Sequence, residues 1–137
     1  MNVEALINDL KRDEGYRATA YRDTQGRLTI GYGFLIEAPG GLLAGEGDTM
    51  LANRLSPVVT ELPKQFSWFA NMSDARQRAL TNMAYQLGIG GLLEFKEMLS
   101  AMGNGDYMEA ASHALDSLWA KQCPERAARV AEMIANG

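Results

Sequence analysis

The chain has 137 residues, 47% of them hydrophobic and 22% charged, which suits one compact domain and excludes a multidomain machine. Its 13 Lys and Arg against 17 Asp and Glu give a formal charge of -4, which disfavours non-specific nucleic-acid binding. A single cysteine, Cys123, excludes an intramolecular disulfide, and a single histidine, His113, excludes sites that need two histidines. Neither a secretion signal nor an apolar stretch long enough for membrane insertion is expected.

Hydrophobic spacing predicts a helix at the N-terminus and then a β-hairpin. Apolar residues recur at helical intervals over 3–10, and Gly15 is placed to end this helix. Between Ala20 and Leu35 the apolar residues follow a strand pattern on both sides of the turn-like segment 24–26, which is typical of a hairpin.

The rest of the chain is predicted to be helical after a loop at 37–48. A short helix over 49–55 is expected to stop before Pro57, because the residue before a proline is disfavoured in a helix. Further helices are predicted over 74–87 with Ser73 as its cap, over 92–102, from 107 to about 121, and from Pro124 towards Ala135. These elements predict an α+β, mainly α fold, a single domain 1–137 with an N-terminal lobe of about 1–56 and a larger helical lobe of about 57–137.

Glu14 lies at the end of the apolar stripe of the first predicted helix. Eleven steps of about 100° bring it back to within about 20° of the direction of Val3. If the helix reaches Glu14, its carboxyl group faces inward near the negative end of the helix dipole. Both effects favour the protonated form that a general acid requires. If the helix frays at 13–15 instead, Glu14 is an ordinary solvated residue.

The predicted hairpin places Asp23 and Thr29. With a three-residue loop at 24–26, Asp23 pairs with Arg27, and alternation puts Asp23, Arg27 and Thr29 on one face. Diagonal neighbours on a face lie about 7 Å apart, which leaves room for a water that Asp and Thr could hold as a nucleophile. Alternatively, Asp23 serves only as the first residue of the turn, a position that Asp favours. A two-residue loop would put Asp23 and Thr29 on opposite faces.

Together these residues form a recognisable pattern. Eight residues separate Glu14 from Asp23 and five separate Asp23 from Thr29, within Asp13-Glu14-Gly15, Tyr21-Arg22-Asp23-Thr24 and Leu28-Thr29-Ile30-Gly31-Tyr32-Gly33. This pattern resembles the phage-type lysozymes of glycoside hydrolase family 24, and those of the T-even phages in particular. The similarity resumes, in the same order, in segments 78–88 and 109–111, at Trp119 and in segment 122–130.

The resemblance implies a lysozyme-like fold with a cleft between two lobes, and a muramidase activity. The expected reaction is hydrolysis of the β-1,4 bond between N-acetylmuramic acid and N-acetylglucosamine in peptidoglycan, with inversion. Glu14 would be the general acid, and Asp23 with Thr29 would position or deprotonate the attacking water. Inversion requires carboxyl groups about 6.5 to 9.5 Å apart.

The resemblance also implies partners and a location. Monomers are the norm in the family, so a monomeric protein is expected, and the sequence predicts no metal, no cofactor and, from its charge, no nucleic-acid partner. As an endolysin, the protein would accumulate in the host cytoplasm and reach the periplasmic peptidoglycan after another protein permeabilises the membrane.

Two ion pairs follow from the same resemblance. Arg126 would pair with Glu14, and Arg129 with Asp13. A positive partner lowers the pKa of a carboxyl group while desolvation raises it, so the net direction at Glu14 stays open.

The resemblance implies further contacts for the substrate. The Gln86 amide would accept a hydrogen bond from the indole N–H of Trp119. Three positions would line the saccharide groove: Leu35, Tyr85 and His113. The alternatives are a surface role for Gln86, plain core packing for Trp119, and a surface or capping role for His113.

The chain also departs from its relatives. Phe34 replaces a histidine that forms a salt bridge, Met98 replaces a groove serine, and Cys123 replaces a threonine at a helix N-cap, where cysteine is a poor cap. The connection over 36–72 is shorter, and Pro57 and Pro63 predict that the long helix joining the lobes has no counterpart.

Two other function classes remain open. One is a lytic transglycosylase or a chitosanase-like glycosidase, although a transglycosylase needs no nucleophilic water and so would not need the Asp23–Thr29 pair. The other is a peptidoglycan-binding module that has lost catalysis.

Overall fold

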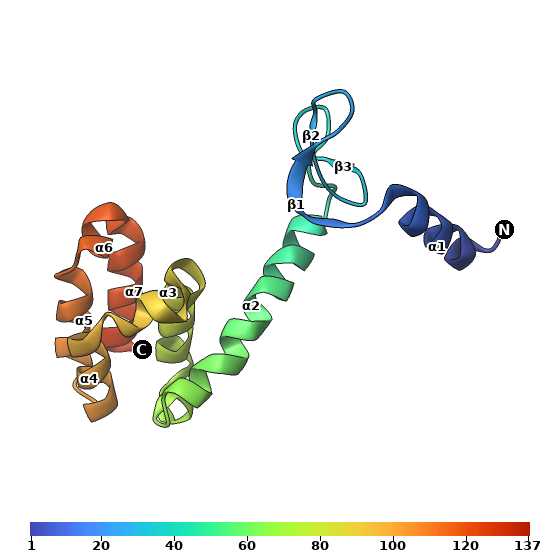
Figure 1. Ribbon diagram of the computed structural model, residues 1–137. Coiled ribbons are helices and arrows are strands. Elements are labelled where there is room, and N and C mark those ends of the chain that lie inside the picture. The colour runs from blue at the N-terminus through green and yellow to red at the C-terminus, as the bar shows by residue number, and fades with distance from the viewer. The chain divides into compact units, whose positions relative to one another are not determined.

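The computed structural model describes residues 1–137, which form two compact units, Met1–Met50 and Leu51–Gly137. The chain is mainly helical with one small antiparallel sheet, which confirms the predicted fold class (Figure 1). The helices are α1 (Val3–Glu14), α2 (Glu46–Gln65), α3 (Asp74–Leu93), α4 (Lys96–Asn104), α5 (Tyr107–Leu115), α6 (Leu118–Gln122) and α7 (Pro124–Asn136), with a 3-10 turn at Phe69–Asn71. No helix combines the length and the apolar character that crossing a bilayer would require.

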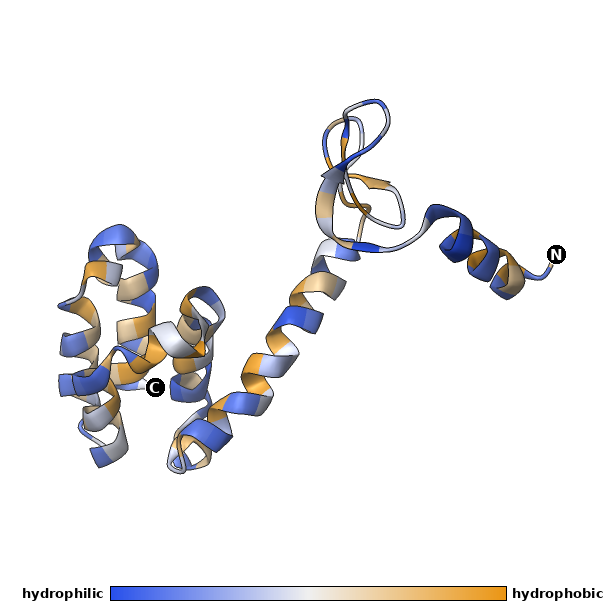
Figure 2. Cartoon of the chain, in the orientation of Figure 1, coloured by the Kyte–Doolittle hydropathy of each residue, from blue (hydrophilic) through white to orange (hydrophobic).

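Helix α1 ends at Gly15, as the sequence predicts, and it is capped at its start by Asn2. The Asn2 side chain accepts a hydrogen bond from the Ala5 N–H at 3.1 Å, and Gly15 ends the helix with a φ of 68°. The helix therefore includes Glu14, and the alternative in which it frays at 13–15 is wrong. Its apolar stripe is visible along one side (Figure 2), but none of its residues is buried, and Val3 is 56% exposed.

The sheet has the order β1 (Arg17–Arg22), β2 (Leu28–Gly31) and β3 (Phe34–Leu35). Tyr21 lies opposite Thr29, and the Asp23 N–H donates to the Arg27 carbonyl at 2.9 Å. Gly26 takes a φ of 77°, which closes the loop 24–26. The predicted three-residue loop is confirmed, and the two-residue alternative is wrong.

A second, tighter turn joins β2 to β3. Ile30 pairs with Phe34, so the chain reverses within Gly31-Tyr32-Gly33. Gly31 and Gly33 have φ values of 66° and 76°, a region that residues with a Cβ rarely adopt. The two-residue strand β3 is too short to be distinguished from the end of the predicted hairpin by its sequence pattern.

Helix α2 contradicts two expectations. A loop at 37–48 and a short helix ending before Pro57 were predicted, whereas a continuous helix runs from Glu46 to Gln65 with Pro57 and Pro63 inside it. Both prolines are exposed, and Pro57 lies opposite the face formed by Leu55, Val58 and Leu62. Leu62 is fully buried, so core packing on one face outweighs the helix-breaking effect of prolines on the others. The expectation that a long helix has no counterpart in this region is therefore wrong.

Several helix ends in the helical unit lie where the sequence predicts them, and two do not. The Ser73 hydroxyl accepts from the Arg76 N–H, and α7 begins at Pro124, as predicted. Gly88 interrupts α3 with a φ of 75°, but helical residues continue to Leu93, so α4 begins at Lys96 rather than at 92. The helix predicted over 107–121 is split, because the Ser117 side chain caps a new helix, α6.

In the core of the helical unit, α7 packs against α3, α5 and α6, and α4 packs against α5. Its largest fully buried side chains are Leu62, Leu80, Met83, Leu92, Met98, Met102 and Ile134. Most of the apolar burial in the chain therefore lies after residue 60, and the first unit depends on turns and local contacts for its geometry.

Candidate active site

Glu14 is the last residue of α1, and its carboxylate lies over the β2–β3 turn. Its Oε2 atom is 2.8 Å from the point where a Cβ on Gly33 would stand, so the carboxylate occupies the space that a side chain would fill. Glu14 is exposed. Within the first unit, the inward, partly desolvated position expected for its carboxyl group is therefore not found.

An aromatic contact links the same two segments. The rings of Tyr16 and Tyr32 have centroids 5.1 Å apart and are tilted by 50°. Tyr16 follows Glu14 by two residues, and Tyr32 directly precedes Gly33. The end of α1 thus contacts the turn both before and after Gly15.

Asp23 is held by the hairpin loop. Its Oδ1 atom accepts hydrogen bonds from the backbone N–H groups of Gln25 and Arg27 at 2.9 and 2.8 Å, and its Oδ2 atom accepts one from Arg27 Nε at 3.0 Å. The backbone N–H of Arg27 is the main cause that lowers the pKa of Asp23, and these bonds outweigh the opposing effect of desolvation. Asp23 therefore does serve as the first residue of the turn, which was the alternative role predicted for it. Its lowered pKa keeps the carboxylate ionised.

Thr29 is the most buried polar residue of the first unit, at 3% exposure. Its hydroxyl donates its only proton to the Arg27 carbonyl at 3.0 Å. The lone pairs of the Thr29 oxygen can therefore still accept a hydrogen bond. The strand register places Asp23, Arg27 and Thr29 on one face, and Leu35 lies opposite Thr29 in β3. The structure therefore brings together four residues of the predicted site region.

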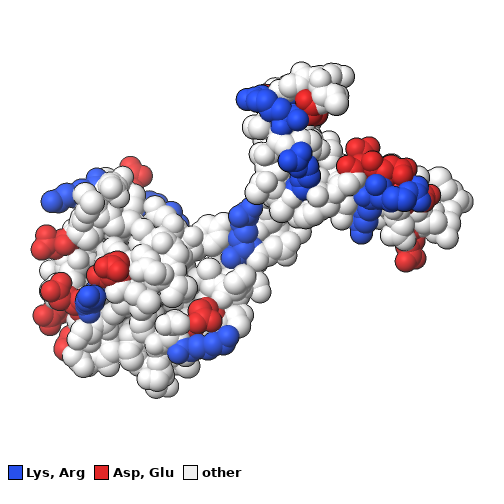
Figure 3. Space-filling model, viewed as in Figure 1, with Lys and Arg blue, Asp and Glu red and all other residues white.

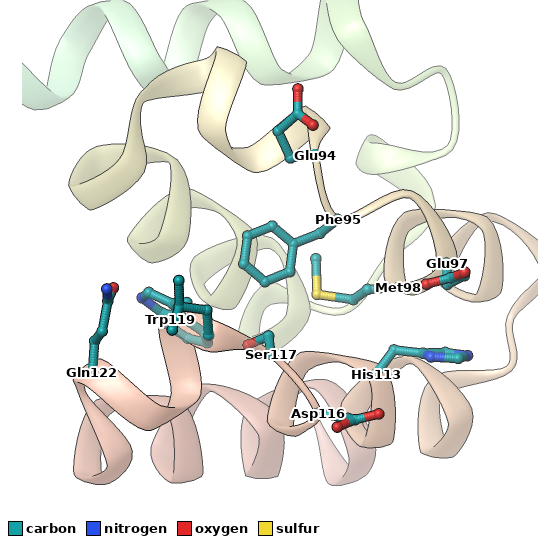
Figure 4. A pocket seen from close by; sticks show the side chains of 10 residues that line it. Glu94, Phe95, Glu97, Met98, His113, Asp116, Ser117, Trp119 and Gln122 are labelled. Carbon is teal, nitrogen blue, oxygen red and sulfur yellow. The ribbon is translucent and has the colours of Figure 1, made fainter.

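A hollow of about 340 Å³ in the helical unit contains two of the expected groove positions (Figure 4). Met98 and His113 line it together with Phe95, Trp119 and three carboxylates, those of Glu94, Glu97 and Asp116. His113 Nε2 is 3.6 Å from Glu109 Oε1 on the same helix. The hollow thus combines an apolar wall with acidic groups.

The predicted contact between Gln86 and Trp119 is present. Trp119 Nε1 donates to Gln86 Oε1 at 2.9 Å, and Trp119 is 5% exposed. The bond ties α3 to α6. Trp119 therefore packs in the core and also orients an exposed amide.

A second hollow, of about 490 Å³, lies between α2, α3 and α7. Tyr85 and Arg126 line it, and Arg126 Nε donates to Asn82 Oδ1 at 2.8 Å. Asn82 was not predicted as a site residue, because a single asparagine in a helix carries no distinguishing pattern. Only the approach of α7 to α3 reveals its partner.

The two predicted ion pairs join residues from different units and stay predictions. Within the first unit, Asp13 accepts from Arg12 Nε at 2.9 Å in an exposed pair. In the helical unit, Arg129 is exposed. Arg126 is held by Asn82, as described above.

The structure also describes the three positions at which the sequence was expected to depart from the family. Phe34 is 60% exposed and meets Tyr32 edge-on at 6.3 Å, so its ring has partial apolar packing. Met98 is buried at 1% exposure. Cys123 stands at the N-cap of α7 without a capping bond, and its thiol donates to the Trp119 carbonyl at 3.1 Å.

The charges of the molecule are mixed in sign. Figure 3 shows Lys and Arg interspersed with Asp and Glu over the visible surface, without a broad area of one sign. No three His, Cys, Asp or Glu side chains lie close enough together to hold a metal ion. Glu14 and Asp23 stay the carboxylates that the sequence predicts to be catalytic.

Comparisons with known proteins identify the family to which the chain belongs. The phage lysozyme family model matches residues 11–132. The pre-baseplate central spike protein Gp5 of Enterobacteria phage T4 is 34% identical over 161 residues, and the match covers 97% of this chain and 28% of that protein. Probable T4-type lysozymes 1 and 2 of Dictyostelium discoideum are each 28% identical over 163 residues, covering 98% of this chain and 96% of those proteins.

The chain is a lysozyme-type enzyme by these criteria, and it belongs to the phage lysozyme family. Membership makes it a glycoside hydrolase of the muramidase type. The chain spans about a quarter of Gp5 but nearly the whole of the two Dictyostelium lysozymes.

Proposed function

We propose that this chain hydrolyses the β-1,4 bond between N-acetylmuramic acid and N-acetylglucosamine in peptidoglycan, with inversion of the anomeric carbon. The observation that carries the proposal is the hairpin face on which an ionised Asp23 and an accepting Thr29 hydroxyl lie with Arg27. Glu14, at the end of α1, supplies the second carboxyl group.

Glu14 acts as the general acid. In the reaction its proton passes to the leaving glycosidic oxygen as the bond from that oxygen to the anomeric carbon breaks. Its exposed position leaves the carboxyl group accessible to a glycan chain.

Asp23 and Thr29 orient the attacking water. The Thr29 proton is donated to the Arg27 carbonyl, so Oγ1 can only accept from the water. Asp23 is ionised and also accepts. A water that donates to both oxygens keeps a lone pair free for the anomeric carbon, and its released proton passes by way of Asp23 to solvent. Because the pKa of Asp23 is lowered, this carboxylate is a weak base, and orientation is its main contribution.

The helical unit supplies contacts to the rest of the glycan. Tyr85 lines the second hollow and His113 the first, and both are at least partly accessible. Saccharides bind through stacking on aromatic rings and hydrogen bonds to polar groups, and these hollows offer both.

The decisive experiment compares purified enzyme variants on peptidoglycan, with release of reducing ends as the readout. We expect Glu14→Gln and Asp23→Ala to lower the rate by about 100-fold or more, since positioned acid and base groups contribute about 10² to 10⁴. Asp9→Asn, an exposed carboxylate on the same helix, is the matched control and should retain full activity. Equal rates for all four proteins would refute the mechanism.

Product analysis distinguishes the related glycosidases. Inversion at a β bond produces the α-anomer first, which proton NMR of fresh product detects before mutarotation. An anhydro sugar would instead identify a lytic transglycosylase, and initial β-anomer would identify a retaining mechanism. Binding to peptidoglycan without any product would favour the inactive module.

We also propose that the enzyme acts as an endolysin held in the host cytoplasm until another protein permeabilises the membrane. Only the resemblance to phage lysozymes supports this location. Expression in the host should leave cells intact until an agent that permeabilises the inner membrane is added, whereas lysis by the enzyme alone would contradict it.

A further inference from the structure

We propose that Gly33 and the Tyr16–Tyr32 pair are positioning residues that hold the Glu14 carboxylate for proton transfer, an inference that rests on the function proposed above. The contact is close. Glu14 Oε2 lies 2.8 Å, and its Cδ 3.6 Å, from the point where a Cβ on Gly33 would stand. The bare backbone of the turn is thus the surface against which the carboxylate is seated.

Glycine at position 33 serves two purposes. Its φ of 76° allows the tight β2–β3 turn, and its missing side chain leaves room for the carboxylate. A methyl group there would meet only the far end of the flexible Glu14 side chain, so the turn need not move but the carboxylate must. A displacement of about 1 Å in a reacting group can cost about 100-fold in rate.

The tyrosine pair controls the other side of Glu14. Gly15 has a φ of 68° and nothing within 4 Å of the place where its Cβ would be, so the link between α1 and β1 has no packing of its own at this residue. The contact of Tyr16 with Tyr32, at 5.1 Å between ring centroids, joins the two segments. Tyr16 is 65% exposed, so this contact orients the end of α1 rather than filling a core.

The matched test is Gly33→Ala against Gly45→Ala. Gly45 lies in the same unit with a φ of 84° and nothing within 4 Å of its Cβ position, so alanine causes similar backbone strain at both sites but meets Glu14 only at position 33. We expect Gly33→Ala to lower kcat by about 10- to 100-fold with KM within about twofold of the parent. Gly45→Ala should retain the parent kcat. Equal kcat values for the two variants would overturn the proposal.

The tyrosine contact has its own conservative control. Tyr16→Ala should lower kcat by about 3- to 10-fold with little change in KM, because the end of α1 is less well held. Tyr16→Phe retains the ring contact and should restore the parent kcat. A loss that is the same in both variants would assign the effect to the hydroxyl and contradict a positioning role for the ring pair.

A readout independent of activity separates this inference from the proposed function. The ¹³C resonance of the Glu14 carboxyl carbon, followed through a pH titration, should differ from the parent in Gly33→Ala and coincide with it in Gly45→Ala. Unchanged Glu14 resonances in Gly33→Ala would overturn the positioning role even if Glu14 is the general acid. If Glu14→Gln keeps its activity, the proposed function fails, and the same titration still decides whether Gly33 seats the carboxylate.

Discussion

Arg76 connects three helices of the helical unit, and its removal should destabilise that unit strongly. Its Nε atom donates to the Ile134 carbonyl at 2.8 Å and its Nη2 atom to the Ala135 carbonyl at 3.2 Å. Its guanidinium also lies 3.6 Å from the centroid of the Tyr107 ring. One side chain on α3 therefore satisfies carbonyls at the end of α7 and packs against α5.

The magnitude of the effect follows from these contacts. A hydrogen bond from a charged group contributes about 1.5 to 3 kcal/mol, and Arg76 is half-buried, so the lower value applies to each bond. The cation–π contact adds about 1 kcal/mol. We expect Arg76→Ala to lower the free energy of unfolding by about 3 to 4 kcal/mol, a large share of the roughly 5 to 15 kcal/mol typical of a domain. At about 2 to 4 °C per kcal/mol, Tm should fall by about 6 to 16 °C.

Thermal and urea unfolding followed by far-UV circular dichroism measure this loss, with Arg78→Ala as the control. Arg78 is two residues further along α3 and pairs with Asp74 at 2.7 Å, but both side chains are well exposed, at 64% and 84%. Such a surface pair contributes about 0.3 to 0.5 kcal/mol. If Arg76→Ala lowers Tm no more than Arg78→Ala does, the inference that Arg76 stabilises the packing of α7 is refuted.

Three further predictions concern other positions. The pKa of Asp23 is lower in the folded than in the unfolded protein, so its stabilising contribution is present above about pH 3.8 and is lost as the pH falls through the folded pKa. The stability difference between the parent and Asp23→Asn should therefore shrink in strongly acidic solution, and a constant difference down to pH 2 would contradict this. Pro57→Ala should raise Tm, because it restores a backbone N–H inside α2 and removes a penalty of up to about 3 kcal/mol; an unchanged Tm would mean that the helix already tolerates the proline without cost. Cys123→Thr should stabilise α7 by about 1 kcal/mol through a capping bond that cysteine does not make, with Cys123→Ala as the control that should show no gain.

Parts of the fold were predictable because they depend on residues close together in the chain. The end of α1 at Gly15, the hairpin loop closed by Gly26 and the cap at Ser73 all follow from the conformations that single residue types favour. The register of β1 with β2 then follows from the length of the loop. Local sterics and capping carry enough information in these cases.

The course of α2 was not predictable in the same way. Pro57 favours a helix end on local grounds, and only the burial of Leu62 in the core explains why the helix continues. The division between α5 and α6 at Ser117 was not predicted either, because the sequence is equally compatible with a serine cap and with a continuous helix. Non-local packing decided the course of α2, whereas the local cap at Ser117 decided the division between α5 and α6.

By itself, the sequence indicated the class of enzyme through its resemblance to a known family. It also set the order of the candidate catalytic residues Glu14, Asp23 and Thr29, which lie within 16 consecutive residues whose turns are set by local chemistry. With a three-residue loop, it also placed Asp23 and Thr29 on one face. Only the tertiary structure revealed that Glu14 is seated against Gly33 and that Asn82 holds Arg126. These contacts join residues 19 and 44 positions apart, and their geometry depends on how whole elements pack, which no local preference specifies.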